Sequence, residues 1–184
     1  MTVALVTPPA VPPVTLAALK EHLRITEGDE DAYLLDLVAA AASHVEHASG
    51  RKLVTQVWRR YGAGLPSTGG LPLGLGPVLR IEAVTLFDIE GTPVQALAGD
   101  WRLVDETLFL DRVSPRAAAN GVEIDVVCGY GDTPDDVPDT LRRAVLMLAA
   151  HWHEFRGAVA PKDQPVSLPP GFDALVRPFR RILL

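Results

Sequence analysis

The stretch TLRRAVLMLAAHWHEF, residues 140–155, carries the clearest periodicity in the chain. Its apolar side chains recur at intervals of three and four, which is typical of one buried stripe on an α-helix. The stripe comprises Leu141, Val145, Leu148 and Trp152. Upstream, Asp136 stands where it can cap such a helix, and Gly157 stands where the helix should end. We therefore expect a long amphipathic helix over 138–156.

Two further helices are predicted near the start of the chain. In VTLAALKEHLRI, residues 14–25, Thr15 is a suitable N-cap for a short helix. A longer helix is expected over 29–49, with Asp29 as its cap and Gly50 as its stop. This second helix carries a row of alanines, and small side chains let another helix approach closely. We expect the helix at 138–156 to pack against that row.

Between these helices the pattern changes to that of β-strands. Strand-like runs rich in β-branched and aromatic residues occupy 53–62, 80–97, 101–110 and 122–131. The connection GAGLPSTGGLPLGLGP, residues 62–77, lacks the Gly-Lys-Ser/Thr ending of a phosphate-binding loop. We predict an α+β fold, an antiparallel helical core with a β-rich insertion, in a single domain over 1–184. Its parts are a helical core at 14–50 and 136–157, a β insertion at 53–129, and a tether with a docking segment at 158–184.

The C-terminal segment FDALVRPFRRILL, residues 172–184, follows a Pro-rich tether. It is a short amphipathic segment, because Pro178 prevents a long undistorted helix. Two interpretations remain open from the residues alone. The segment folds back to cover the core, or it docks into a groove of a partner protein.

Composition and charge narrow the classes of function. The net charge of -6 argues against a surface dedicated to coating DNA. We interpret the basic pairs as solvated surface groups, although they can form local patches; they stand at 51–52, 59–60, 142–143 and 180–181. The first 14 residues form a Pro-rich arm with no charged leader, and no apolar run approaches the ~20 residues that span a bilayer. We expect a soluble protein that is not secreted, in which Cys128 is a buried core residue.

The histidines are candidate metal ligands. His151 and His153 are two residues apart, so on a helix they point to nearly opposite sides and cannot share an ion. His44 and His47 do share a helix face, but a third ligand at suitable spacing is missing. Two histidines near a helix C-terminus also suit the negative end of the helix dipole, which is the interpretation we favour. Turn and capping roles account for the carboxylates between 132 and 139, which are Asp132, Asp135, Asp136 and Asp139. No serine occupies a Gly-x-Ser-x-Gly turn. We predict no catalytic, cofactor-binding or metal-binding residue.

Four pieces of the chain, taken in order, resemble the head–tail connector (adaptor) family of long-tailed bacteriophages and phage-derived gene transfer particles. They are residues 14–25, 29–59, 126–158 and 168–180, together about half of the chain. The specific motifs are G-Y-G-D, V-P-x-x-L-R-x-A and A-x-H-W-x-E, all within 129–154. The β-rich middle matches the family less well. In this family the positions of His151 and Trp152 are packing positions on the third main helix.

The resemblance implies a structural ring protein without catalysis. About a dozen copies, expected to be a dodecamer, would assemble beneath the portal protein and extend the channel for double-stranded DNA without sequence-specific binding. The ring would also support a tail-proximal stopper or tail terminator protein, at the head–tail interface of a virion or virion-like particle made in the bacterial cytoplasm and without a membrane. The rivals are another tail-completion or tail-tube protein, a small metal-dependent enzyme, and a nucleic-acid-binding module.

The resemblance also favours docking of the C-terminal segment on the portal. The residues expected to dock are Phe172, Leu175, Val176, Arg177, Phe179, Arg180 and Arg181. We expect this segment to gain little by covering a core that the main helices and the sheet already close. Deletion of residues 170–184 is accordingly expected to leave a folded protein that no longer binds portal.

Overall fold

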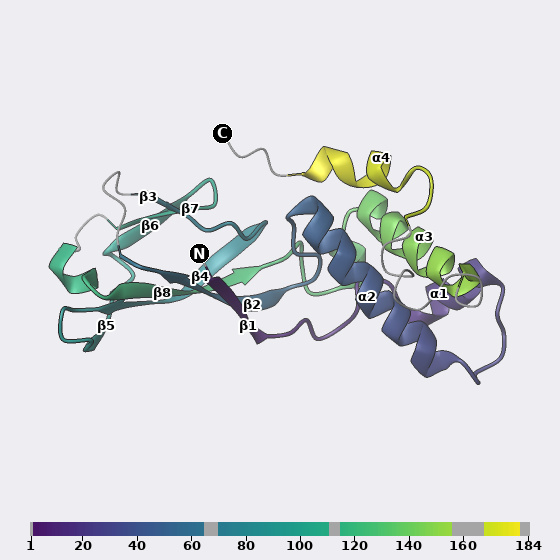
Figure 1. Ribbon diagram of the computed structural model, residues 1–184, viewed down its shortest axis with the longest axis horizontal. Coiled ribbons are helices and arrows are strands. Elements are labelled where there is room, and N and C mark those ends of the chain that lie inside the picture. The colour runs from purple at the N-terminus through teal and green to yellow at the C-terminus, as the bar shows by residue number, and fades with distance from the viewer. Residues whose placement is uncertain (1, 65–69, 111–114, 156–167, 181–184) are drawn as a thin grey trace. The chain divides into compact units, whose positions relative to one another are not determined.

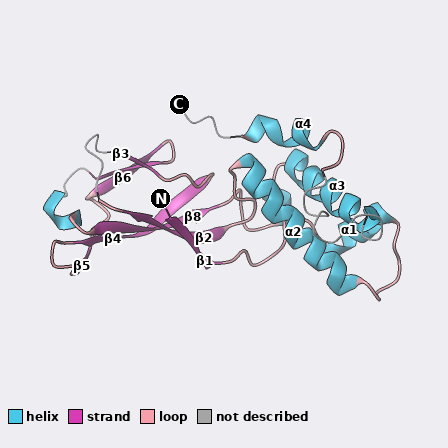
Figure 2. Ribbon diagram, in the orientation of Figure 1, coloured by secondary structure: helices cyan, strands magenta, loops and turns pink. Residues whose placement is uncertain are grey.

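The computed structural model describes residues 2–64, 70–110, 115–155 and 168–180. The chain divides into two compact units, a β unit (residues 1–9 and 55–129) and a helical unit (residues 10–54 and 130–184). Helices and strands are both present, as Figure 2 shows, so the predicted α+β class is confirmed. The finer prediction, an antiparallel helical core that carries an insertion, remains a prediction.

The helical unit is built from segments far apart in the sequence. In chain order its elements are α1 (Leu16–Leu23), α2 (Asp31–Ser49), η2 (Pro134–Asp136), α3 (Asp139–Phe155), α4 (Phe172–Val176) and η4 (Arg177–Phe179). Helix α1 contacts α2 and α3, which contact each other, and α4 contacts both long helices (Figure 1). No helix in the described parts of the chain is long and apolar enough to cross a membrane.

The helix ends test the predicted caps. Thr15 caps α1 as predicted, because its side chain accepts a hydrogen bond from the Ala18 amide at 3.1 Å. Gly50 ends α2 in the left-handed conformation, at a φ of 69°. The prediction that Asp29 caps α2 is wrong. The helix begins at Asp31, so the N-cap position is Glu30, and no side chain caps it. Asp29 lies one residue earlier, in a turn in which the Asp31 amide donates to the Gly28 carbonyl.

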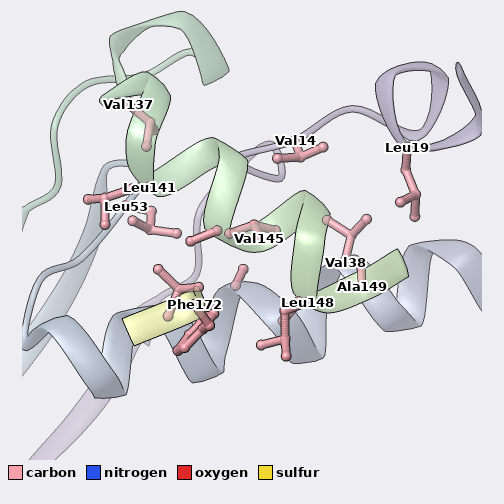
Figure 3. Packing of buried hydrophobic residues seen from close by; sticks show 14 of the residues in the cluster. Val14, Leu19, Val38, Leu53, Val137, Leu141, Val145, Leu148, Ala149 and Phe172 are labelled. Carbon is pink, nitrogen blue, oxygen red and sulfur yellow. The ribbon is translucent and has the colours of Figure 1, made fainter. Parts of the chain in front are cut away.

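The interior of the helical unit forms where α2 and α3 meet. Ala41 and Ala144 are fully buried in the same apolar cluster, which confirms the predicted packing of the alanine row against α3. The predicted stripe on α3 is buried in this cluster as well. Figure 3 shows side chains from α2, α3 and α4 converging on this interior, with Val38, Leu148 and Phe172 among them. Gly157, the expected stop of α3, lies outside the described residues.

The β unit contains two antiparallel sheets. The larger has the strand order β1-β2-β8-β4-β5, and the smaller has the order β3-β7-β6. The strands are β1 (Thr2–Thr7), β2 (Gln56–Gly62), β3 (Gly70–Pro72), β4 (Val78–Phe87), β5 (Pro93–Gln95), β6 (Trp101–Val104), β7 (Thr107–Leu110) and β8 (Gly121–Cys128), with the 3-10 turn η1 (Pro115–Ala118) before β8. The interpretation of the first residues as a Pro-rich arm is wrong for Thr2–Thr7, which pair with β2 instead.

Alternation along β8 determines which side of the larger sheet faces the core. Val122, Ile124 and Val126 are buried in the second apolar cluster, whereas Glu123 and Asp125 between them are half-buried. Cys128 is also buried in this cluster, as predicted. The charged side of the sheet holds a bidentate pair in which Arg59 donates to the two Asp125 oxygens at 2.7 and 2.8 Å.

Candidate partner-docking site

The predicted docking segment comprises α4 and η4, and its apolar side chains face the core of the helical unit. Phe172 and Val176 are 2% and 0% exposed, and both belong to the cluster between α2 and α3. Leu175 and Phe179 are partly buried against the same cluster. The expectation that this segment gains little by covering the core is therefore wrong, because without it the cluster would lose two fully buried side chains. Of the two interpretations left open by the sequence, covering the core is the one that the burial supports.

Polar contacts fix the segment to the end of α2. Arg180 Nε donates to the Ala48 carbonyl at 3.2 Å, and Arg51 Nε donates to the Phe179 carbonyl at 3.1 Å. The guanidinium of Arg180 also pairs with Asp173 of α4. A cation at the carbonyl end of a helix interacts favourably with the helix dipole, so Arg180 contributes to the C-terminal cap of α2.

The outward side of the segment is exposed and basic. Arg177 and Arg180 are exposed, as is Pro178, while the apolar side chains of the segment point inward. Arg181, the last residue of the predicted docking set, lies outside the described residues, and so do residues 156–167 of the predicted tether. A partner meeting this segment would therefore contact the arginines rather than the apolar stripe.

His44 joins the segment to the long helices as a packing residue. Its ring lies 5.5 Å from the Phe172 ring and 6.0 Å, edge on, from the Trp152 ring, measured between centroids. Burial, together with the nearby charge of His47, holds the pKa of His44 below its usual value. A neutral imidazole between aromatic rings suits a packing role. The sequence pattern alone indicates only a metal ligand or a partner of the helix dipole at this position.

The histidines at 151 and 153 lie apart, as their spacing required. His151 packs against Phe155 with ring centroids 4.7 Å apart. His153 Nε2 lies 3.2 Å from a carboxylate oxygen of Glu30, and its ring lies 6.2 Å from that of Tyr33. The predicted packing roles of His151 and Trp152 agree with this placement, since Trp152 is 6% exposed.

The described residues give no support to a metal-binding site. Among the residues that the structure describes, no three side chains of the His, Cys, Asp or Glu type gather as a metal-binding group. The carboxylates before α3 have local partners instead. Asp136 accepts hydrogen bonds at 2.8 Å from the Thr133 amide and hydroxyl, which lower the pKa of Asp136, and Asp135 and Asp139 pair with Arg142. Asp136 thus closes η2 rather than capping α3.

The basic pairs are largely committed to contacts within the chain. Arg59 pairs with Asp125, and Lys52 pairs with Glu46 at 3.1 Å. The interpretation of these residues as solvated is wrong for Arg60, which is only 5% exposed and donates to the Leu73 carbonyl. Arg59, Arg60 and Lys52 already have carboxylate or carbonyl partners, so they are poorly placed to bind DNA phosphates.

Comparisons with known proteins bear on the predicted resemblance. A family model described as phage gp6-like head-tail connector protein matches residues 13–74. No curated protein matches the chain. Among solved structures, a chain from the neck of an empty gene transfer agent particle, computed with C6 symmetry, is 27% identical and superposes with a TM-score of 0.83; 100% of this chain and 97% of that chain are covered.

Two further solved structures agree. A chain in the virion of a native gene transfer agent particle is 26% identical with a TM-score of 0.83, and one in the neck of a native particle, computed with C12 symmetry, is 27% identical with a TM-score of 0.75. Both alignments cover 100% of this chain and 97% of the other. The family model and these structures confirm the predicted resemblance of the chain to head–tail connector proteins, which are structural proteins of the neck of phage-like particles.

Proposed function

We propose that the chain is a head–tail adaptor that forms a ring below the portal, extends the DNA channel and provides the platform for tail attachment. The observation that carries this proposal is the likeness over the whole chain, both units included, to neck chains of gene transfer agent particles. Those necks were computed with C6 and C12 symmetry, which supports a ring, expected to be a dodecamer, for this chain too.

The partners follow from a position in the neck. On one side the ring would contact the portal, and on the other a tail-proximal stopper or terminator protein. Double-stranded DNA would pass through it without sequence-specific binding, and the net charge of -6 is compatible with that passage because strong phosphate binding would hinder it. No catalysis is proposed, and the histidines and carboxylates have the packing and capping contacts described above.

This role is tested by deleting the gene for the chain in the strain that makes the particle. Filled or empty heads without tails are expected, and a plasmid copy of the intact chain should restore tailed particles. A deletion strain that still makes normally tailed particles would contradict the proposal. Heads that carry an incomplete tail would instead support a tail-completion or tail-tube protein, the runner-up.

For portal docking we propose the outward side of α4 and η4. Phe172 and Val176 hold the segment on the helical unit, and this leaves Arg177 to pair with carboxylates of the portal. Arg180 is also exposed there, although it already contacts the Ala48 carbonyl and Asp173. This assigns different roles to the two halves of the predicted docking set. The buried residues position the segment, and the exposed arginines make the contact.

A charge reversal at Arg177 tests the docking surface. Arg177→Glu should weaken portal binding about tenfold or more in a pull-down, because like charges across an interface repel, while the melting temperature stays unchanged. Arg143→Glu is the matched control, since Arg143 is also exposed on the helical unit but lies on α3. Binding that survives Arg177→Glu unchanged would place the portal contact on another surface.

A further inference from the structure

The two edges of the larger sheet in the β unit differ in kind. One edge is β1, which pairs with β2 and with no other described strand. The opposite edge is formed by β5 beside the end of β4. An edge strand presents unpaired backbone amides and carbonyls to any other extended chain, so most proteins protect their edges by charge, proline, bulges or short length.

The β1 edge carries few of these protections. Its six residues, TVALVT, include neither a charged side chain nor a proline. Val3, Leu5 and Val6 are 41%, 46% and 48% exposed, which is high for aliphatic residues in a strand. One irregularity interrupts the pairing with β2, between Leu5 and Thr7, so the regular ladder runs over residues 2–5. This edge is open to pairing along that ladder.

The opposite edge is protected in several ways. Strand β5 has only three residues, and it begins with Pro93, which has no amide hydrogen to donate. Strand β4 carries register shifts at two places in its pairing with β8, and Arg80 and Glu82 are exposed on it. The sheet is therefore closed to strand addition at one edge and open at the other.

The exposed side chains of β1 continue the buried side of the sheet. Val3 lies opposite Arg60, and Leu5 lies opposite Trp58, in the antiparallel register. Arg60 is buried and Trp58 packs against the second apolar cluster, so this is the side that faces the core. A strand placed beside β1 would cover Val3 and Leu5 and extend the apolar core by one strand.

We propose that the β1 edge is the surface at which a second copy of this chain adds an extended segment, so that strand pairing joins neighbouring copies of the ring. The inference rests on the proposed ring. In a ring every contact is heterologous, so one surface of each copy meets a different surface of the next, and a sheet with one open and one closed edge meets this requirement.

The neutrality of β1 favours a second copy over the other partners of the neck. The proposed portal contact uses exposed arginines, whereas β1 offers only aliphatic and hydroxyl side chains and a backbone ladder. Neutral, apolar surfaces are typical of permanent contacts between subunits, and they attract neither phosphates nor charged rims.

Amide hydrogen exchange, measured for the full chain as free protomer and as assembled ring, tests the proposal. In an antiparallel ladder alternate amides point to opposite sides, so every second amide of residues 2–5 is bonded to β2 and the others face outward. The outward amides should exchange quickly in the protomer, and about tenfold or more slowly in the ring. A ring in which these amides exchange as quickly as in the protomer would overturn this inference and leave the proposed function standing.

A double substitution provides the second readout. Val3→Lys with Leu5→Lys should raise the concentration needed for half-assembly about tenfold or more, because lysine on an edge strand opposes pairing. The matched control is Ile89→Lys with Leu97→Lys, two aliphatic residues that are 80% and 73% exposed at the other end of the sheet; it should assemble normally.

The remaining outcomes are also decisive. Three outcomes would overturn the inference. The β1 variant could assemble normally, the chain could assemble into two-fold dimers only, or the β1 amides could become protected only when portal or tail protein is added. A chain that forms no ring, alone or in the particle, would refute the proposed function and this inference together. Protomer melting temperatures of all variants should match the unaltered chain, since the substituted side chains are exposed.

Discussion

The helical unit and the β unit bury their apolar residues to different extents. In the helical unit the core is closed on the side of α4 by a segment that comes from far along the chain. In the β unit the core is covered by the smaller sheet, yet most of the exposed large apolar residues in the described chain belong to this unit, among them Val3, Leu79 and Val94. The helical unit thus buries most of its apolar side chains within itself. The β unit leaves several of its apolar side chains exposed, where they can contact other molecules.

Because of this difference, substitutions in the two units should have different effects. Substitutions inside the helical unit should act mainly on its stability, because its side chains are engaged with one another. Substitutions on exposed aliphatic residues of the β unit should act mainly on assembly. Portal binding is the exception within the helical unit, because Arg177 is exposed.

The largest expected effect of a single substitution is at Phe172, the residue that closes the helical core. Phe172→Ala should lower the free energy of unfolding by about 3–5 kcal/mol, because it removes a buried ring and leaves a cavity. Urea denaturation followed by circular dichroism measures this loss. Leu168→Ala, at a residue that is 48% exposed just before α4, is the control and should change stability by less than about 0.5 kcal/mol. Equal stability of the two variants would mean that α4 does not close the core.

By the same reasoning, deletion of residues 170–184 should destabilise the helical unit instead of leaving it intact. The deletion removes Phe172 and Val176 from the core together with the contacts of Arg180. Hydrogen exchange should show faster exchange in α3, while the amides of β8 remain protected. A truncated chain with unchanged protection in α3 would restore the original expectation of a dispensable docking segment.

A smaller effect is expected where α2 and α3 meet. Ala144→Leu should cost about 1–3 kcal/mol, because the fully buried site has no room for the added methylenes. Ala40→Leu makes the same change at an exposed position of α2 and serves as the control. Chemical denaturation measures the free energy of unfolding of both variants. If Ala144→Leu lowers it no more than Ala40→Leu does, the two helices are not closely packed at this site.

The smallest effect concerns pH. Because the folded-state pKa of His44 lies below its ordinary value of 6.5, the unfolded chain binds more protons than the folded chain just below that pH. Stability should therefore fall as the pH drops below about 6.5. His44→Phe keeps an aromatic ring between Trp152 and Phe172 and should flatten this part of the pH profile of the melting temperature. An unchanged slope would exclude His44 as its source.

Local patterns in the sequence were sufficient for the helices. The spacing of Leu141, Val145 and Leu148 identified α3, and Thr15 and Gly50 marked helix ends, because these signals act over a few residues. Asp29 was misassigned because it lies in a turn that begins at Gly28, which moves the N-cap position to Glu30, and only the three-dimensional backbone reveals that turn.

Non-local contacts explain the other errors. The four β-branched residues of TVALVT are a strand signal that the interpretation as an arm overlooked. The partner of this strand could not be predicted locally, because β1 pairs with β2, some fifty residues later in the chain. The stripe on α4 was predicted correctly, but its burial depends on His44 and Trp152, which the sequence does not place nearby. The burial of Arg60 could have been predicted. Adjacent residues of a strand point to opposite faces, so Arg59 and Arg60 could not both be solvated in a covered sheet.

The mass of the assembled full-length chain tests the central claim most directly. Native mass spectrometry on purified protein, supported by images of the same sample, should show one closed species of about a dozen copies with circular symmetry, as heterologous contacts that close require. A protein that stays monomeric or forms only dimers, or that grows into filaments without a fixed copy number, would contradict the account of this chain as a ring-forming head–tail adaptor.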